Sequence, residues 1–209
     1  MRLILASASP RRAELLTAAG FTFETIATNI DESVRPSESP FGYVRRIASE
    51  KSAAAMAKLA SDLESLPRAE NAAGQGTNRD LTPVVLAADT AVVLYETILG
   101  KPRDDRDAAE MLRRLSGRAH DVMTGVSVRQ GTVEVGRVET TRVQFAPLTD
   151  EDVKWYVASG EGRDKAGAYG IQGLASRFIP RIDGSYTNVV GLPVATVVDL
   201  LRRGLKTNF

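Results

Sequence analysis

The sequence predicts a single α/β domain with a mixed central sheet flanked by helices. Strand-like and helix-like segments alternate over the first half of the chain, a pattern typical of parallel strands joined by helices. The middle of the chain instead holds two long strand-like segments, about 119–129 and 132–146, separated by Gln130-Gly131. That short connection predicts an antiparallel pair, so we expect a partly antiparallel sheet. The length of 209 residues suits one large domain or two small lobes around one core.

Each element is expected from a local signal. Ser9 can serve as the N-cap of a helix and Pro10 fits the first helical position, while Gly20 is typical of a helix end. Thr149 and Asp152 have the spacing of a capping box. The expected elements, in order, are a strand at 2–7, a helix at 10–19, an extended segment at 21–27, a helix from Pro40 to about Leu59, a strand at 84–88 that stops at Asp89-Thr90, a hairpin of 91–95 and 98–99, a helix at 105–115, the two long strands, a short helix through Val157, a Gly-rich loop at 160–173, a strand near 177–182 and a last helix from Pro193 to about Arg203.

Residues 62–82 differ from the rest of the chain. They are rich in Asn, Gly, Pro, Gln and charged residues and show little periodicity, which predicts an exposed insertion. A buried-type strand at 84–88 follows at once, so this segment is not expected to separate two domains. We therefore treat residues 1–209 as one domain.

Composition excludes several classes of function. A net charge of +1 argues against bulk electrostatic binding of nucleic acid, although a local basic pocket for a small anion remains open. The chain has no cysteine and a single histidine, which excludes a disulfide framework, a thiolate site and a multi-histidine zinc site. No apolar run reaches the ~18 residues of a membrane helix, and the start of the chain does not resemble a signal peptide. The expected location is the cytoplasm.

The segment 3–12 places two arginines in the first turn of a helix that follows a strand and a Ser-rich turn. Free backbone N–H groups and the helix dipole favour an anion at that position. Arg11 and Arg12 add charged donors that suit phosphate oxygens. For this stretch alone, a surface helix start with two solvated arginines is an equally good interpretation.

Four other residues suggest chemistry. Asp89 follows an apolar strand, where a carboxylate can act as a general base or merely cap the next turn. Lys51 falls on the apolar stripe of its predicted helix, so its ammonium must pair or reach solvent. Lys101 lies between Gly and Pro in a tight turn, and Glu32 in an acidic loop could hold a divalent cation with Asp89. Taken singly, ordinary solvated roles are the better interpretation of Lys101 and Glu32.

The Gly-rich segment 164–173 is more specific. Its small residues let the backbone approach a ligand closely, and Gln172 can both donate to and accept from a base edge. His120 begins a strand and is more typical of a structural hydrogen-bonding residue than of a catalyst. Cations and carboxylates without a nucleophilic thiol suit Mg²⁺-assisted attack of water on a polyphosphate.

The ordered set of motifs resembles the Maf family of nucleoside triphosphate pyrophosphatases, which is historically linked to septum formation. The resemblance spans nearly the whole chain, although the insertion at 62–82 has no counterpart that we can assign. The motifs that carry it are Ser7-Ala8-Ser9-Pro10-Arg11-Arg12, Glu50-Lys51, Ala88-Asp89-Thr90, Gly100-Lys101-Pro102, the run from His120 to Val126, the run from Asp164 to Gly173, and Gly184-Ser185-Tyr186 with the run from Asn188 to Pro193.

This resemblance implies a fold similar to that of inosine-triphosphate pyrophosphatases, with two lobes around a cleft. It also implies cleavage between the α- and β-phosphates with a divalent cation (Mg²⁺, Mn²⁺ or Co²⁺), and a homodimer. By motif position, Asp89 would be the general base. Lys51 and Lys101 would also be catalytic and, with Arg12, would hold the phosphates. Ser9 and Glu32 would help to bind the substrate, and Glu32 and Asp89 would hold the metal.

Three positions separate the substrate branches of this family. The branch that acts on dTTP and UTP resembles this chain at Arg11, Thr90 and Gln172, where the 7-methyl-GTP branch has Trp, Gln and Glu. An amide such as that of Gln172 can pair with the acceptor–donor–acceptor edge of uracil or thymine. Two alternatives stay open: a nucleotide-binding regulator of cell division that acts through a protein partner, and activity on modified pyrimidine nucleotides.

Overall fold

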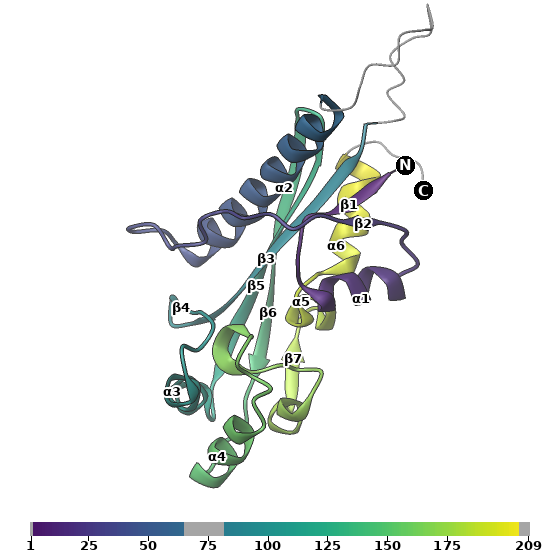
Figure 1. The fold of residues 1–209 in the computed structure, drawn as a ribbon. Coiled ribbons are helices and arrows are strands. Elements are labelled where there is room, and N and C mark those ends of the chain that lie inside the picture. The colour runs from purple at the N-terminus through teal and green to yellow at the C-terminus, as the bar shows by residue number, and fades with distance from the viewer. Residues whose placement is uncertain (1, 65–81, 205–209) are drawn as a thin grey trace, which may run out of the picture.

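The computed structural model describes residues 2–64 and 82–204 (Figure 1). Helices flank a seven-stranded mixed sheet with the strand order β2-β1-β3-β5-β6-β7, and β4 pairs with β3. The elements are β1 (Leu3–Leu5), α1 (Pro10–Ala18), β2 (Glu24–Thr25), α2 (Pro40–Glu64), β3 (Val84–Leu94), β4 (Thr97–Leu99), α3 (Asp105–Leu115), β5 (Ala119–Gln130), β6 (Val133–Gln144), α4 (Asp150–Ala158), the 3₁₀ turns η2 (Ala166–Ala168) and η3 (Leu174–Phe178), β7 (Arg181–Asp183), α5 (Tyr186–Val190), α6 (Val194–Asp199) and the π-helical turn η4 (Leu200–Gly204). The predicted fold class is confirmed.

Strand β3 organises the sheet. One edge pairs antiparallel with β5 from Val84 to Val93. The other edge is shared by two short strands: parallel β1 covers Val84 to Leu86, and antiparallel β4 covers Val92 to Leu94. The stretch of β3 between these two partners therefore faces a gap in the sheet.

Helices cover both faces of the sheet, with α2 on one face and α1 and α6 on the other (Figure 1). Side chains in β1 and β3 alternate between the faces, as the two-residue period of a strand requires. Leu3, Leu5 and Leu86 pack with Leu16 of α1 and Val197 of α6. The intervening Ile4, Val85 and Ala87 pack with Ala55 and Leu59 of α2.

A separate apolar cluster lies at the far end of β3. Val92 and Leu94 pack there with Phe145, with Leu112 of α3 and with Tyr156 of α4. The polar pair Asp89-Thr90 therefore lies where β3 passes from one apolar cluster to the next. This division agrees with the expected two lobes.

Several predicted elements are confirmed by their capping contacts. The helix expected at 105–115 is α3, whose N-cap Asp104 accepts a hydrogen bond from the Asp107 backbone. Thr149 and Asp152 form the expected capping box at the start of α4. The turn at Gln130-Gly131 joins β5 to β6, with Gly131 at a φ of 57°.

Other boundaries were wrong. The strand expected to stop at Asp89-Thr90 continues to Leu94, because β5 pairs with both halves without interruption. Only Glu24–Thr25 of the extended segment 21–27 pairs as a strand, and the strand near 177–182 is replaced by η3 and then β7. The short helix α5 was not predicted.

The predicted insertion at 62–82 is described only in part. Helix α2 extends beyond the expected end near Leu59 and reaches Glu64, so it enters this segment. Residues 65–81 lie outside the part of the chain that the structure describes. In the described part, no helix combines the length and apolar character needed to cross a membrane.

Candidate active site

A cleft of about 820 Å³ opens beside the unpaired stretch of β3. This volume is within the ~300–1,000 Å³ of typical ligand sites. The segment that follows β1 forms one end of the cleft, and β4 with the Gly-rich loop forms the other. All nine residues predicted for the site line this cleft: Ser9, Arg11, Arg12, Glu32, Lys51, Asp89, Thr90, Lys101 and Gln172.

Lys51 joins the two predicted carboxylates. Its Nζ atom lies 2.8 Å from Asp89 Oδ1 and 2.7 Å from Glu32 Oε1. Lys51 follows Ile47 by one helical turn on the buried stripe of α2, and its ammonium pairs instead of reaching solvent. Asp89 and Lys51 are both buried, whereas the Glu32 side chain is 53% exposed. These three paired charges therefore come from β3, α2 and the loop before α2.

Glu32 and Asp89 present oxygens to one point in the cleft, because both contact the same ammonium. Two converging carboxylates fit the donor set of Mg²⁺, which commonly takes one or two carboxylates and completes its shell with water and substrate phosphates. Within residues 2–64 and 82–204, no group of three or more Asp, Glu, His or Cys side chains could hold a metal alone. A cation here would take the rest of its ligands from water and from a bound molecule such as a phosphate.

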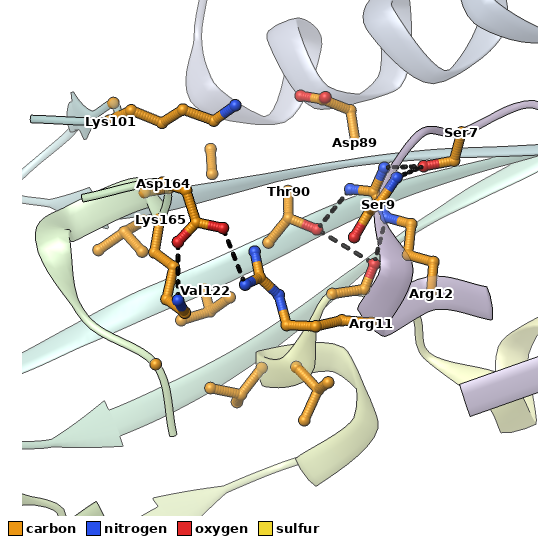
Figure 2. Close-up of a pocket in the computed structure, with 18 of the residues that line it drawn as sticks. Ser7, Ser9, Arg11, Arg12, Asp89, Thr90, Lys101, Val122, Asp164 and Lys165 are labelled. Carbon is orange, nitrogen blue, oxygen red and sulfur yellow. Dashed lines mark hydrogen bonds and ion pairs between the residues drawn. The ribbon is translucent and has the colours of Figure 1, made fainter. Parts of the chain in front are cut away.

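The start of α1 forms the expected basic end of the cleft. Ser9 occupies the N-cap position, but its side chain caps no backbone N–H group. Arg11 lies across the cleft mouth from the Gly-rich loop, with Nη1 3.4 Å from Asp164 Oδ2 (Figure 2). Lys101 is exposed at the opposite side, and in the described part of the chain its ammonium has no ion pair or hydrogen bond. Arg11 and Lys101 are thus the cations most accessible to a ligand.

Arg12 points inward. Its guanidinium donates to the backbone oxygens of Gly191 and Ala88 at 2.8 and 2.7 Å, and to the hydroxyls of Ser7 and Thr90 at 3.2 Å. Burial lowers the pKa of Arg12, and the negative charges of Asp89 and Glu32 oppose that shift. Arg12 therefore joins the β1–α1 turn, β3 and the segment after α5. It also satisfies a carbonyl on the unpaired edge of β3.

The three predicted specificity positions lie in different surroundings. Arg11 is half-buried at the mouth. The Thr90 hydroxyl is enclosed by Arg12, Thr124 and the Gly191 carbonyl, at 3.2, 2.9 and 3.3 Å. Gln172 is exposed in the cleft, and its side chain makes no hydrogen bond with any described residue. Its amide is therefore available to a ligand.

Two residues that sequence analysis did not identify hold the Gly-rich loop. Glu161 accepts hydrogen bonds from the Tyr156 hydroxyl and the Leu174 backbone, both at 2.8 Å, and the same hydroxyl accepts from the Gly170 backbone at 3.2 Å. Both the carboxylate of Glu161 and burial raise the pKa of Tyr156, burial more strongly. A buried tyrosine needs a polar partner. The sequence could therefore indicate that Tyr156, if buried, has a polar partner, but it could not identify that partner as Glu161.

His120 of β5 supports the same loop through Tyr169. Its Nε2 atom lies 2.7 Å from the hydroxyl of Tyr169, a residue that lines the cleft. Burial lowers the pKa of His120 to about 4, so the ring is neutral at neutral pH. The structural role expected for this histidine agrees with its buried position.

Comparison with known proteins decides the family. The family described as "Maf-like protein" matches residues 2–204. This chain belongs to the Maf family. A "dTTP/UTP pyrophosphatase" of Anaeromyxobacter sp. is 47% identical over 207 residues, which cover 97% of this chain and 89% of that protein.

Two further Maf relatives bear the same description. The protein of Shewanella oneidensis is 48% identical and covers 96% of this chain and 97% of its own length. That of Escherichia coli O157:H7 is 48% identical, with coverages of 95% and 91%. Among solved structures, the Ham1 protein of Staphylococcus aureus aligns over 99% of this chain and 98% of its own length, at 13% identity and a TM-score of 0.48.

Proposed function

We propose that this Maf protein hydrolyses dTTP and UTP to the nucleoside monophosphate and pyrophosphate. The observation that carries the proposal is the pairing of Lys51 with Asp89 and Glu32 inside a cleft that also presents Arg11 and Lys101. Cations suit the triphosphate, and carboxylates suit activation of water. The names of the relatives, at 47–48% identity, support the same substrates.

Asp89 is the proposed general base. Its Oδ1 atom is held by Lys51, and no hydrogen bond from another described residue reaches its other oxygen. A water beside that oxygen gives a proton to Asp89 and forms a bond from its own oxygen to the α-phosphorus. The bond from the α-phosphorus to the bridging oxygen breaks, and pyrophosphate leaves with the electron pair. Lys51 keeps the carboxylate of Asp89 oriented through this step.

The remaining cations hold the phosphates. Arg11 and Lys101 approach the triphosphate from opposite sides of the cleft, and the start of α1 adds backbone N–H groups next to Ser9. Arg12 attracts the phosphates through its charge and not through direct hydrogen bonds, because its nitrogens already donate to protein acceptors. Glu32 and Asp89 would hold the divalent cation (Mg²⁺, Mn²⁺ or Co²⁺). When bound, that cation neutralises phosphate charge and helps to orient the triphosphate.

Gln172 is the proposed reader of the base. Its side chain has no hydrogen-bond partner among the described residues, and its amide can match the acceptor–donor–acceptor edge of uracil and thymine. Thr90 acts by shape, since its hydroxyl is enclosed by protein groups. As further parts of this proposal, we infer from the family resemblance a homodimer, measurable by light scattering, and a cytoplasmic location.

The decisive experiment measures pyrophosphate release from a panel of standard and modified nucleoside triphosphates with each cation. Asp89→Asn should lower kcat by about 100-fold or more, the usual contribution of a general base. The matched control is Asp121→Asn, which removes a half-buried carboxylate paired with Arg142 outside the cleft and should leave kcat unchanged. Normal turnover by a folded Asp89→Asn protein would refute the assigned base. Nucleotide binding without turnover by the wild-type protein would favour the regulatory alternative.

A further inference from the structure

The loop that carries Glu32 has little apolar support. In this loop, residues 31–37 are all exposed, and Val34 is 50% exposed. None of the side chains at 27–39 belongs to the apolar clusters formed by the described residues. The position of Glu32 beside Lys51 must therefore depend on polar contacts.

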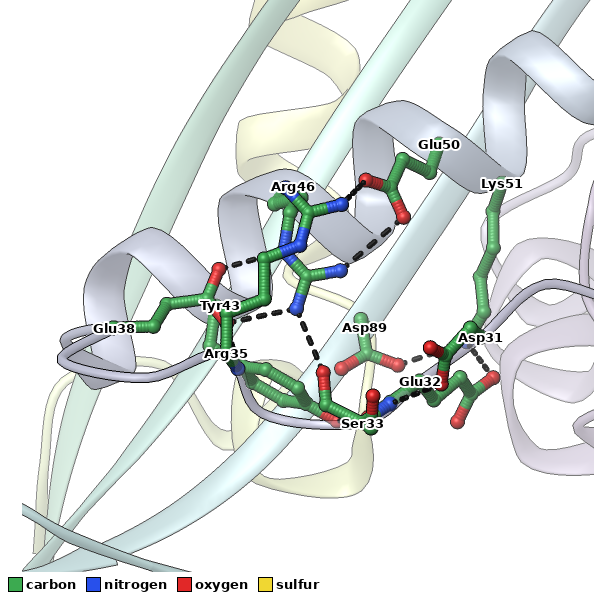
Figure 3. Close-up of polar contacts among 10 residues, drawn as sticks. All are labelled: Asp31, Glu32, Ser33, Arg35, Glu38, Tyr43, Arg46, Glu50, Lys51 and Asp89. Carbon is green, nitrogen blue, oxygen red and sulfur yellow. Dashed lines mark hydrogen bonds and ion pairs between the residues drawn. The ribbon is translucent and has the colours of Figure 1, made fainter.

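Arg46 of α2 makes three of those contacts (Figure 3). Its Nε and Nη2 atoms donate to the two carboxylate oxygens of Glu38 at 2.6 and 2.7 Å. Its Nη2 atom also donates to the backbone oxygen of Ser33 at 3.0 Å, one residue from Glu32. The side chains of Arg46 and Glu38 are only 13% and 12% exposed, so this pair is shielded although the loop around it is not.

Neighbouring residues complete the arrangement. Tyr43, one turn earlier in α2, donates from its hydroxyl to the backbone oxygen of Glu32 at 3.1 Å. Glu50, one turn later, accepts from Arg46 at 3.2 Å and from Arg35 of the loop at 2.8 Å. The spacing of positions 43, 46 and 50 places them on one face of the helix.

The same helix carries Lys51, which contacts Glu32 and Asp89. Helix α2 thus holds both the lysine of the site and the arginine that fixes the loop opposite it. A shift of the loop would remove Glu32 without disturbing the pair between Lys51 and Asp89. That separation makes the role of Arg46 testable.

We propose that Arg46 is a positioning residue that holds the 31–38 loop on α2, so that Glu32 lies beside Lys51 and Asp89 to share the divalent cation. The inference rests on the proposed function for the role of the cation, but not for the order of the loop. The forked guanidinium is needed, because it binds both oxygens of Glu38 and a carbonyl at once. A lysine would keep the charge and lose this geometry.

The first test is amide hydrogen exchange of the full-length protein and of its Arg46→Gln and Arg46→Lys variants. We expect exchange in the 31–38 loop to rise about tenfold or more in Arg46→Gln, the effect of losing a charge-assisted hydrogen bond. Arg46→Lys should be intermediate, and α2 beyond Lys51 should be unchanged. The matched control is Arg113→Gln, which removes an exposed ion pair to Asp150 on the far lobe. Unchanged exchange in the loop would overturn the proposal.

The second test is Mn²⁺ binding, measured by calorimetry without nucleotide and again with a non-hydrolysable dTTP analogue. Arg46→Gln should weaken the binding of Mn²⁺ with the analogue by about 10- to 100-fold, as expected when the support of a metal ligand is lost. The double variant Arg46→Gln/Glu32→Gln should bind as weakly as Glu32→Gln alone, because Arg46 acts through Glu32. Additive losses would overturn the proposal.

The two proposals fail in different ways. A wild-type protein that releases no pyrophosphate would refute the proposed function, while loosening of the loop in Arg46→Gln would still support its anchoring by Arg46. An active wild-type enzyme whose loop and Mn²⁺ affinity are insensitive to Arg46→Gln would refute only the positioning role.

Discussion

The two walls of the cleft are held in place mainly by different kinds of polar contact. The wall formed by β3, α2 and the 31–38 loop is held by ion pairs: Lys51 with Asp89 and Glu32, and Arg46 with Glu38. The Gly-rich loop of the other wall also makes surface ion pairs, such as Arg163 with Asp105, but the part that lines the cleft is held by hydrogen bonds around Glu161 and Tyr156.

Glycines shape the second wall. A side chain at Gly162 would collide with the Ala168 backbone, and Gly167 adopts a φ of 69° that L residues rarely take. The result is a loop whose backbone is fixed, while the amide of Gln172 makes no hydrogen bond with the part of the chain that the structure describes. The carboxylates proposed for catalysis are thus held by ion pairs, whereas the amide proposed to read the base is left available to a ligand.

The largest expected effect comes from breaking the charged wall at Lys51. Lys51→Met leaves the carboxylate of Asp89 without its partner, so we expect kcat for dTTP to fall by about 100- to 1,000-fold. The loss should exceed any change in KM, which steady-state kinetics will separate. Lys58→Met on the exposed face of the same helix is the control and should behave as wild type. Equal losses in both variants would point to a general effect on α2.

Acidification should distinguish the two walls. The folded pKa of His120 is lowered to about 4 from 6.5, so its contribution to stability is complete above pH 6.5 and is lost as the pH falls toward 4. Hydrogen bonds from Arg46 lower the pKa of Glu38 to about 2. The contribution of Glu38 to stability is therefore complete above about pH 4.5 and is lost only as the pH falls toward 2. The Gly-rich wall should therefore weaken first.

Denaturant unfolding at pH 7 and pH 5 checks this prediction. The wild-type protein should lose on the order of 2 kcal/mol through His120, while His120→Gln should lose that much less. Because the chain contains a single histidine, its NMR titration can be followed without overlap. If the wild-type protein and His120→Gln lost the same free energy of unfolding, the loss could not come from protonation of His120, and the prediction would be wrong.

The smallest of these effects is expected at Gln172. Gln172→Ala removes a side chain that makes no hydrogen bond within residues 2–64 and 82–204, so the melting temperature should not change. We expect kcat/KM for dTTP and UTP to fall about tenfold, the value of one hydrogen bond to the base. Gln130→Ala, at the far end of β5, serves as the control. An unchanged preference among bases would remove Gln172 from recognition.

Much of the local structure was predictable because its signals lie within a few residues of one another. Pro10 at the start of α1, the capping box of Thr149 and Asp152, and the turn at Gly131 follow from local backbone preferences. The motifs that carry the family resemblance are also short. All nine predicted site residues line one cleft, although their individual roles remain predictions.

Asp89 illustrates what local signals could not decide. The apolar run before it suggested a strand end, yet β3 continues because β5 pairs through both halves. Asp89 lies on the α2 face of β3, as Val85 and Ala87 do, and lines the cleft beside the stretch that β1 and β4 leave unpaired. Strand ends and register depend on distant segments, which periodicity within one strand does not report.

The sequence by itself determined the fold class, most helices and nine of the residues that meet in the cleft. Only the tertiary structure decided how those residues are paired: Lys51 bridges two carboxylates, Arg12 turns toward protein carbonyls, and Arg46 fixes the loop of Glu32. The physical reason is that the partner of a buried charge is set by which segments pack together. Such contacts span tens of residues along the chain and arise only when the sheet and α2 are assembled.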